Sequence, residues 1–153
     1  MRVDLQELQQ RLGVALRDRD LLEQALLHPS FLNENPGYPL GSNERLEFLG
    51  DAVLGLVIAL ELYTRCPDLA EGELTQLRSH LVKRETLARI ARELGLGEVL
   101  RLGRGEAATG GRERESNLAA TLEAVLGAVF LDQGYDGARE VTLRVLREAL
   151  EET

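Results

Sequence analysis

NERLEFLGDAVL, residues 43–54, is the most informative stretch of this 153-residue sequence. It places Glu44, Glu47 and Asp51 at positions i, i+3 and i+7, which lie along one face of an α-helix. Residues 52–60 follow without one charged or hydrogen-bonding side chain, a pattern typical of a helix that is buried on all sides. An acidic face is therefore predicted to run directly into the core of a helical protein.

These three carboxylates repel one another, and burial adds to the cost. A cation offsets that cost, and Mg²⁺ prefers oxygen ligands such as carboxylates. The alternative is an acidic first turn that is solvated and stabilised by the helix dipole. This alternative suits Glu44 better than Asp51, because the dipole effect fades beyond the first turn. Spacing alone makes Glu47 and Asp51 candidates for metal binding and leaves both interpretations open.

The bulk composition predicts one globular domain with a core of its own, since 44% of the residues are hydrophobic. A single cysteine, Cys66, excludes an internal disulfide, and two histidines offer no zinc-ligand pattern. No apolar run is long enough to span a membrane and no secretory leader opens the chain, so we expect a cytoplasmic protein without membrane attachment. The net charge of −8 argues against a protein that grips nucleic acid by charge alone. It fits an acidic cleft in which bound cations reverse the local sign.

Helical periodicity runs through most of the chain, and no segment alternates with the period of a strand. The sequence therefore predicts an all-α fold of about seven helices around a single core. Asp4 and either Asp18 or Asp20 are expected to cap the first two helices, and His28-Pro29 is expected to end the second. The predicted helical ranges are 4–12, 18–27, 43–65, 71–94, 98–102, 115–133 and 136–151, with loops at 33–42 and 103–114.

The stretch at residues 43–54 closely resembles the signature helix of the ribonuclease III family. Other segments resemble the family in the same order along the chain: residues 25–31, 71–82, 105–112 and 116–132. The resemblance covers roughly residues 5 to 150. It implies a single endonuclease domain over residues 1–153, with no double-stranded-RNA-binding domain in this chain.

The resemblance implies a homodimeric endonuclease that cleaves double-stranded RNA, as in RNA processing, with Mg²⁺ as cofactor and Mn²⁺ as a substitute. It assigns metal binding to Glu47, Asp51 and Glu123, of which Asp51 and Glu123 are catalytic. Glu123 lies among apolar neighbours, where an unpaired carboxylate is costly. The alternative for Glu123 is an exposed position on an amphipathic helix.

Small residues on the two acid-bearing helices predict that the helix axes come close together. Gly50 and Gly55 lie on the first helix, and Ala120, Ala124 and Gly127 lie on the second. A close approach is expected to bring Glu123 within metal-bridging distance of the other two carboxylates.

Ala120 departs from the family pattern, because an aspartate usually stands three residues before the glutamate that matches Glu123. Natural drift, a deliberate Asp→Ala change and a lineage that cleaves differently all remain open. Asn117, one turn earlier, is either a polar residue at the helix end or a group that contributes an amide oxygen or holds a water.

Glu44 and Glu71 match further acidic positions of the family's cleft, and the resemblance implies roles in substrate binding. For Glu71 the alternative is an ordinary acidic residue in a first helical turn. Arg104 and Arg112 are expected to contact RNA phosphates, because they lie with two more arginines around a glycine-rich stretch. The alternative there is a flexible, solvated loop.

Phe48 matches the bulky position that inserts into the partner subunit in the family, so the resemblance implies a two-fold homodimer. Packing of Phe48 inside its own chain is the alternative. A rival function is a catalytically silent relative that binds RNA or a ribonucleoprotein partner, and Ala120 is its main support. A purely structural helical dimer is the third possibility.

Overall fold

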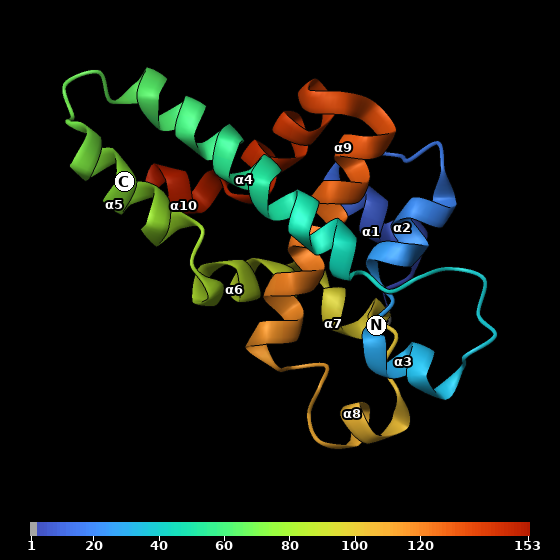
Figure 1. Ribbon diagram of the computed structural model, residues 1–153. Helices are drawn as coiled ribbons and strands as arrows, with labels where there is room; N and C mark the ends of the chain where they lie inside the picture. The colour runs from blue at the N-terminus through green and yellow to red at the C-terminus, as the bar shows by residue number, and fades with distance from the viewer. Residues whose placement is uncertain (1–2) are drawn as a thin grey trace.

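The computed structural model describes residues 3–153 and is all-helical over that range, as predicted (Figure 1). Outside the helices, one isolated parallel bridge joins Leu27 and Arg101. The helices of this range are α1 (Leu5–Leu12), α2 (Arg19–Ala25), α3 (Pro29–Glu34), α4 (Glu44–Arg65), α5 (Glu71–Leu81), α6 (Arg84–Leu94), α7 (Leu96–Val99), α8 (Arg104–Ala108), α9 (Glu115–Val145) and α10 (Arg147–Glu151).

The two long helices α4 and α9 form the central pair, and α2 and α6 pack against α9 (Figure 1). Gly50 and Gly127 make their closest contact possible. A Cβ atom on Gly50 would overlap the carbonyl oxygen of Glu123, and one on Gly127 would overlap that of Leu46. The predicted approach through small residues is confirmed at these two positions. Gly55 takes no part in it, because nothing lies within 4 Å of the place its Cβ would occupy.

The predicted helix starts and stops are largely confirmed. The Asp4 carboxylate accepts from the Glu7 N–H at 2.8 Å, and Asp18 accepts from the Asp20 N–H at 3.0 Å. Gly95 ends α6 with φ +81°, a conformation that favours glycine. Gly134, with φ +77°, interrupts α9 where the sequence predicted a break.

Two short helices were missed by the sequence analysis. Pro29 does not simply end the second helix; it opens α3 at the first helical position, where its missing N–H costs nothing. The stretch predicted as a loop at 103–114 contains α8 at its start.

Three other boundaries differ from the prediction. The helical stretch predicted over 71–94 divides between Leu81 and Arg84, and the final helix divides at Leu146. The turn predicted at 98–102 lies earlier, at Leu96–Val99, because the helix starts directly from the left-handed Gly95. None of these changes alters the fold class.

The expectation that α4 is buried on all sides is wrong for the single chain. Leu54 and Ile58 are fully buried, whereas a stripe along the opposite side is exposed. It consists of Phe48, Ala52, Leu56, Leu60 and Tyr63, which recur every three or four residues along α4. We call these five residues the α4 stripe. No helix in the described part of the chain is both long and apolar enough to cross a membrane.

Candidate metal centre

The candidate metal centre is built where α4 and α9 touch. Asp51 follows Gly50, and Glu123 supplies the backbone carbonyl against which Gly50 packs. The Asp51 and Glu123 carboxyl groups are within hydrogen-bonding reach of each other, and the charge of Glu47, one turn earlier on α4, acts on Glu123 as well. A backbone contact between two helices therefore brings these carboxyl groups together.

The ionisation of this cluster is strongly perturbed. Burial, a hydrogen bond with Asp51 and the charges of Asp51 and Glu47 raise the pKa of Glu123 to about 8. Burial, followed by the charges of Glu44 and Asp51, also raises the pKa of Glu47 above its usual value. Negative charge is thus unfavourable here without a counter-charge, which a proton or a cation can supply.

An oxygen-only donor set of this kind suits a hard divalent cation such as Mg²⁺. The side chains are nevertheless not gathered around one point: among residues 3–153, no three His, Cys, Asp or Glu side chains are placed to hold a metal ion together. The expected gathering of Glu47, Asp51 and Glu123 within bridging distance of one cation is therefore not present among the described residues, and Ala120 offers no oxygen of its own. The carboxyl groups are still suitable ligands for such a cation. Of the pairings that a metal site would need, the one between Asp51 and Glu123 is present.

The two other acidic residues lie in different places. Glu44 borders the cluster, because its charge raises the pKa of Glu47, and it accepts a hydrogen bond from Ser42 Oγ at 3.0 Å. Glu71 is exposed in the first turn of α5 and lines a separate hollow of about 260 Å³ beside Leu62 and Tyr63. Within one chain, Glu71 is not among the charges that perturb Glu47 or Glu123.

The four arginines around residues 103–114 have different surroundings. Arg112 donates to the carbonyls of Gly97 and Leu100 at 3.0 and 2.5 Å. These bonds within the protein occupy its guanidinium group, so its presence needs no contact with RNA. Arg114 is paired with Glu106, and Arg101 lies 4.8 Å from the centre of the Phe31 ring. The Arg104 side chain is fully exposed and lies 3.8 Å from Glu34. Arg104 is therefore the arginine of this group that is best placed to meet a phosphate.

A polar network beside the cluster was not anticipated. His28 Nε2 lies 3.1 Å from Asn117 Oδ1, and the Asn117 amide donates to Glu106 at 2.9 Å and to the Gly111 carbonyl at 3.0 Å. Asn117 is buried, and its amide group is used in these contacts within the protein. The sequence did carry a signal for His28: a histidine before Pro29 stands at a helix N-cap.

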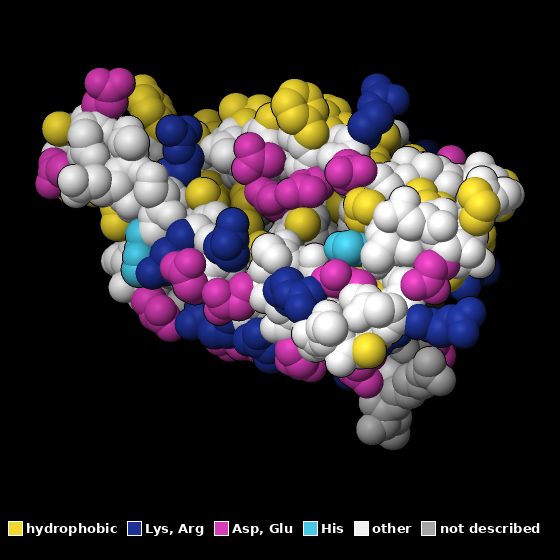
Figure 2. All heavy atoms as spheres, turned by 60° about the horizontal axis from the view of Figure 1, so that its bottom comes forward, with side chains coloured by type: hydrophobic (Ala, Val, Ile, Leu, Met, Phe, Trp, Pro, Cys, Tyr) yellow, Lys and Arg dark blue, Asp and Glu magenta, His cyan; other side chains and the backbone are white. Residues whose placement is uncertain are grey.

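Phe48 is 81% exposed, which excludes packing of its ring inside its own chain. Leu131 of α9 is also exposed, at 55%. Figure 2 shows acidic side chains gathered across the middle of one face, with hydrophobic side chains along its upper edge. The α4 stripe therefore begins within the acidic sequence segment and leaves a row of apolar groups in solvent, as expected of an interaction surface.

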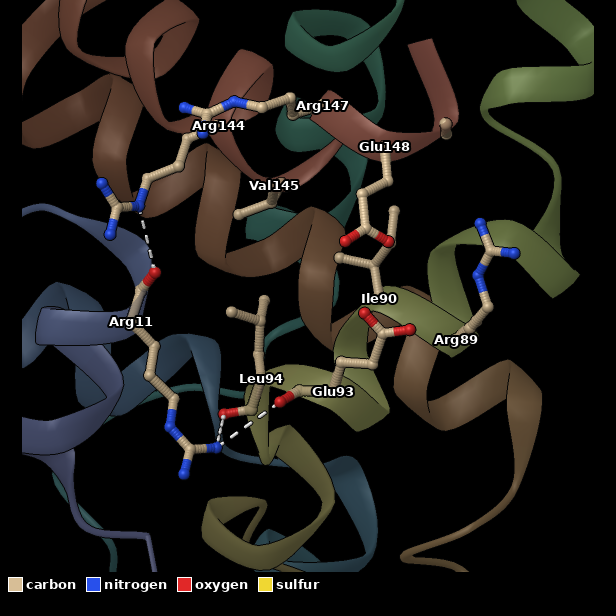
Figure 3. Close-up of a pocket in the computed structure, with 10 residues that line it drawn as sticks. Arg11, Arg89, Ile90, Glu93, Leu94, Arg144, Val145, Arg147 and Glu148 are labelled. Atoms are coloured by element: carbon tan, nitrogen blue, oxygen red, sulfur yellow. Dashed lines mark hydrogen bonds between the residues drawn. The ribbon is translucent and has the colours of Figure 1, made fainter. Parts of the chain in front are cut away.

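A separate hollow of about 420 Å³ lies between α1, α6 and the end of the chain (Figure 3). Its charged residues are of both signs: Arg11, Arg89, Arg144, Arg147, Glu93 and Glu148. Arg11 donates to the Leu94 carbonyl at 3.2 Å, and Arg144 donates to the Arg11 carbonyl at 3.3 Å. These bonds tie α1 to α6 and α9, so the hollow is explained by helix packing.

Similar proteins agree with this fold. The Ribonuclease-III-like family model matches residues 18–150. Ribonuclease 3 of Dehalococcoides mccartyi (strain ATCC BAA-2266) is 53% identical over 149 residues, which are 97% of this chain and 63% of that protein. Ribonuclease 3 of Thermobifida fusca is 53% identical over 142 residues, 93% of this chain and 58% of that protein. The chain thus spans about three-fifths of the length of these relatives.

Among solved structures, the nuclease domain of ribonuclease III from Campylobacter jejuni superimposes with a TM-score of 0.88 at 39% identity, covering 95% of this chain and 97% of that one. Dicer from Pichia stipitis matches with a TM-score of 0.65 at 28% identity, over 89% of this chain and 57% of that one. The fold is therefore that of a helical nuclease domain. This chain belongs to the ribonuclease III family.

Proposed function

We propose that this chain is an endonuclease that hydrolyses phosphodiester bonds of double-stranded RNA with Mg²⁺, for which Mn²⁺ can substitute. The observation that carries the proposal is the half-buried Glu123 carboxyl group, which meets Asp51 across the backbone contact of α4 and α9. Two carboxyl groups held close together lower the stability of the fold. A role in metal-dependent phosphodiester hydrolysis explains why the protein carries them.

Each residue of the cluster takes a role from its position. Glu47, Asp51 and Glu123 would hold the metal, which when bound neutralises phosphate charge and activates a water. Asp51 and Glu123 are best placed to orient the attacking water and accept its proton, because their carboxyl groups are within hydrogen-bonding reach of each other. Glu44 borders the same face, and Arg104 would contact an RNA phosphate nearby. Glu71 and Arg112 stay in the proposed substrate surface, with less support from their surroundings than Arg104.

The substrate is proposed to be an RNA duplex, because arginine–phosphate contacts recognise the shape of the backbone. Arginine and backbone N–H groups position phosphates without reading sequence, and A-form RNA is recognised mostly by shape and backbone. The chain carries a net charge of −8, so its affinity for RNA depends on cations at the acidic face.

The active form is proposed to be a two-fold homodimer formed through the α4 stripe. A stripe of five residues on one helix can pack against the same stripe of a second copy, as a two-fold interface requires. The Campylobacter jejuni nuclease domain is described as having a flexible region involved in dimer formation. Two acidic clusters in one dimer would then each cut one strand of the duplex.

Ala120 is expected to slow cleavage without affecting the fold. Alanine is a strong helix former, and a missing carboxylate removes one repulsive charge. Water can fill a vacant position around Mg²⁺, although the loss of a supporting ligand typically weakens a site by about 10–100-fold. We therefore expect slow cleavage, or cleavage only at raised Mg²⁺ or Mn²⁺.

The decisive experiment compares the chain with its Ala120→Asp variant on a long RNA duplex over a range of Mg²⁺ concentrations. The variant should cleave faster and at lower Mg²⁺, and Glu123→Gln should abolish cleavage in both backgrounds. RNA binding without any cleavage, unchanged by Ala120→Asp, would instead support the catalytically silent relative. Vigorous cleavage by the unchanged chain at low Mg²⁺ would show that the carboxylate at position 120 is dispensable.

A further inference from the structure

A directional chain of hydrogen bonds starts at His28, at the edge of the acidic cluster. Its Nδ1 accepts from the Ser30 N–H at 3.0 Å, as the cap of α3. The ring proton therefore lies on Nε2, which donates to Asn117 Oδ1 at 3.1 Å. Burial lowers the pKa of His28, opposed by the bond to Asn117 and the charge of Glu44, so the ring is neutral at pH 7.

The two partners of this ring, Ser30 and Asn117, each hold part of the segment 103–114. Ser30 Oγ lies 2.7 Å from His28 Nδ1 and accepts from the Gly103 N–H at 2.9 Å. On the other side, Asn117 donates to Glu106 and to the Gly111 carbonyl. Glu106 is also paired with Arg114 at the end of the segment. One imidazole thus connects α3, the α8 segment and the start of α9.

The imidazole also lies between the two acid-bearing helices. The charge of Glu44, in the first turn of α4, acts on His28, and Asn117 stands six residues before Glu123 on α9. Six residues correspond to about 9 Å along the helix axis. Arg104, directly after the anchored Gly103, is exposed on the segment that His28 holds.

We propose that His28 is a positioning residue for RNA: through Ser30 and Asn117 it fixes the segment 103–114, so that Arg104 meets a phosphate of a duplex whose scissile bond lies at the acidic cluster. The inference rests on the proposed nuclease function and deepens it. A network in which each polar group has a partner specifies one arrangement of its segments. Its purpose here is the placement of a guanidinium, with a smaller contribution to stability.

The test uses the variant His28→Asn. Asparagine at a helix N-cap accepts from the N–H two or three residues on, so α3 keeps its cap. The shorter side chain does not reach Asn117, so the bond that fixes the Asn117 amide, and through it the segment, is cut. His80→Asn is the matched control, because His80 is exposed in the last turn of α5.

Two readouts are measured on the full chain, and both work without cleavage. Hydrogen exchange of the amides at 105–114 should accelerate in His28→Asn and stay unchanged in His80→Asn. The Kd for an RNA duplex in Ca²⁺ should rise about three- to tenfold, equivalent to the net value of one hydrogen bond. In the Ala120→Asp background, KM should rise by the same factor with little change in kcat.

A double variant shows whether the effect passes through Arg104. Arg104→Ala alone should weaken RNA binding, and adding His28→Asn should weaken it little further, because the group being positioned is gone. Additive losses, unchanged exchange at 105–114, or a fall in kcat at constant KM would each overturn the proposal. Failure of every variant to cleave RNA would refute the nuclease function alone, since exchange and Kd would still report on His28.

Discussion

Gly50→Ala is expected to be strongly destabilising, because the added methyl group meets backbone on both sides. Its carbon would overlap the Glu123 carbonyl oxygen and lie 2.6 Å from the carbonyl carbon and 3.0 Å from the Gly127 nitrogen. Backbone atoms cannot rotate away as a side chain can. The axes of α4 and α9 must therefore separate, which disturbs the packing along both helices.

The magnitude follows from two opposing effects. Overpacking of a core typically costs about 1–3 kcal/mol, and backbone obstruction places this site at about 3 kcal/mol. Alanine in place of glycine within a helix returns about 0.5–1 kcal/mol. A net loss of about 2–2.5 kcal/mol is a large part of the usual 5–15 kcal/mol of stability, and lowers Tm by about 4–10 °C at this chain length.

Gly55→Ala is the matched control on the same helix. Nothing lies within 4 Å of its added Cβ, so the variant should gain about 0.5–1 kcal/mol. Urea and thermal unfolding are compared in EDTA at one protein concentration, because dimerisation makes Tm depend on concentration. Equal stability of the two variants would refute the close helix contact. The rise in Tm on adding Mg²⁺ should also shrink in Gly50→Ala, since Asp51 and Glu123 move apart.

Three further predictions concern charge and association. In EDTA, stability should increase as pH falls from 8 towards 4.5, because the folded state raises the pKa of Glu123 to about 8. Thermal melts of Glu123→Gln should show a smaller slope, with the part due to Glu47 remaining, and higher stability near pH 8. Although desolvation acts in the opposite direction, the backbone N–H groups of Arg17 and Asp18 hold the pKa of Asp132 below its usual value. Water screens this partly exposed site, so Asp132→Asn should cost only about 0.2–1 kcal/mol at pH 7. The difference should disappear as pH falls through the folded pKa, which urea melts at pH 7 and pH 3 check. Phe48→Asp should convert a dimer at micromolar concentration into a monomer in sedimentation, and a wild-type chain that is already monomeric would contradict the two-site arrangement.

The parts of the fold that depend on local rules were predictable. Asp4 and Asp18 mark helix starts, and Gly95 and Gly134 mark stops because they adopt positive φ. Pro29 was misread because proline both ends and begins helices, and the choice depends on the His28 side chain, which caps α3. The pair His28-Pro29 is visible in the sequence, but the sequence alone does not show whether the His28 ring turns back to cap a following helix.

The candidate site was predictable only in part. The spacing of Glu47 and Asp51 places them on one helix face, but their meeting with Glu123 depends on a contact between distant segments. Arg112 and Asn117 look like groups available to RNA or metal, yet hydrogen bonds within the protein engage both. Burial of the α4 stripe was overestimated for a related reason. An apolar helix face predicts that something covers it, but the sequence does not show whether the same chain or a second molecule does so.

The contact between Gly50 and Gly127 also has a consequence for the order of folding. The two glycines lie far apart in sequence, so their contact carries the loop-closure cost of a late, non-local event. The Asp51–Glu123 pair therefore does not exist in a chain that has formed helices but has not docked α9 on α4. A partly folded copy has no assembled acidic site, so the proposed cleavage of RNA would arise only together with the finished fold.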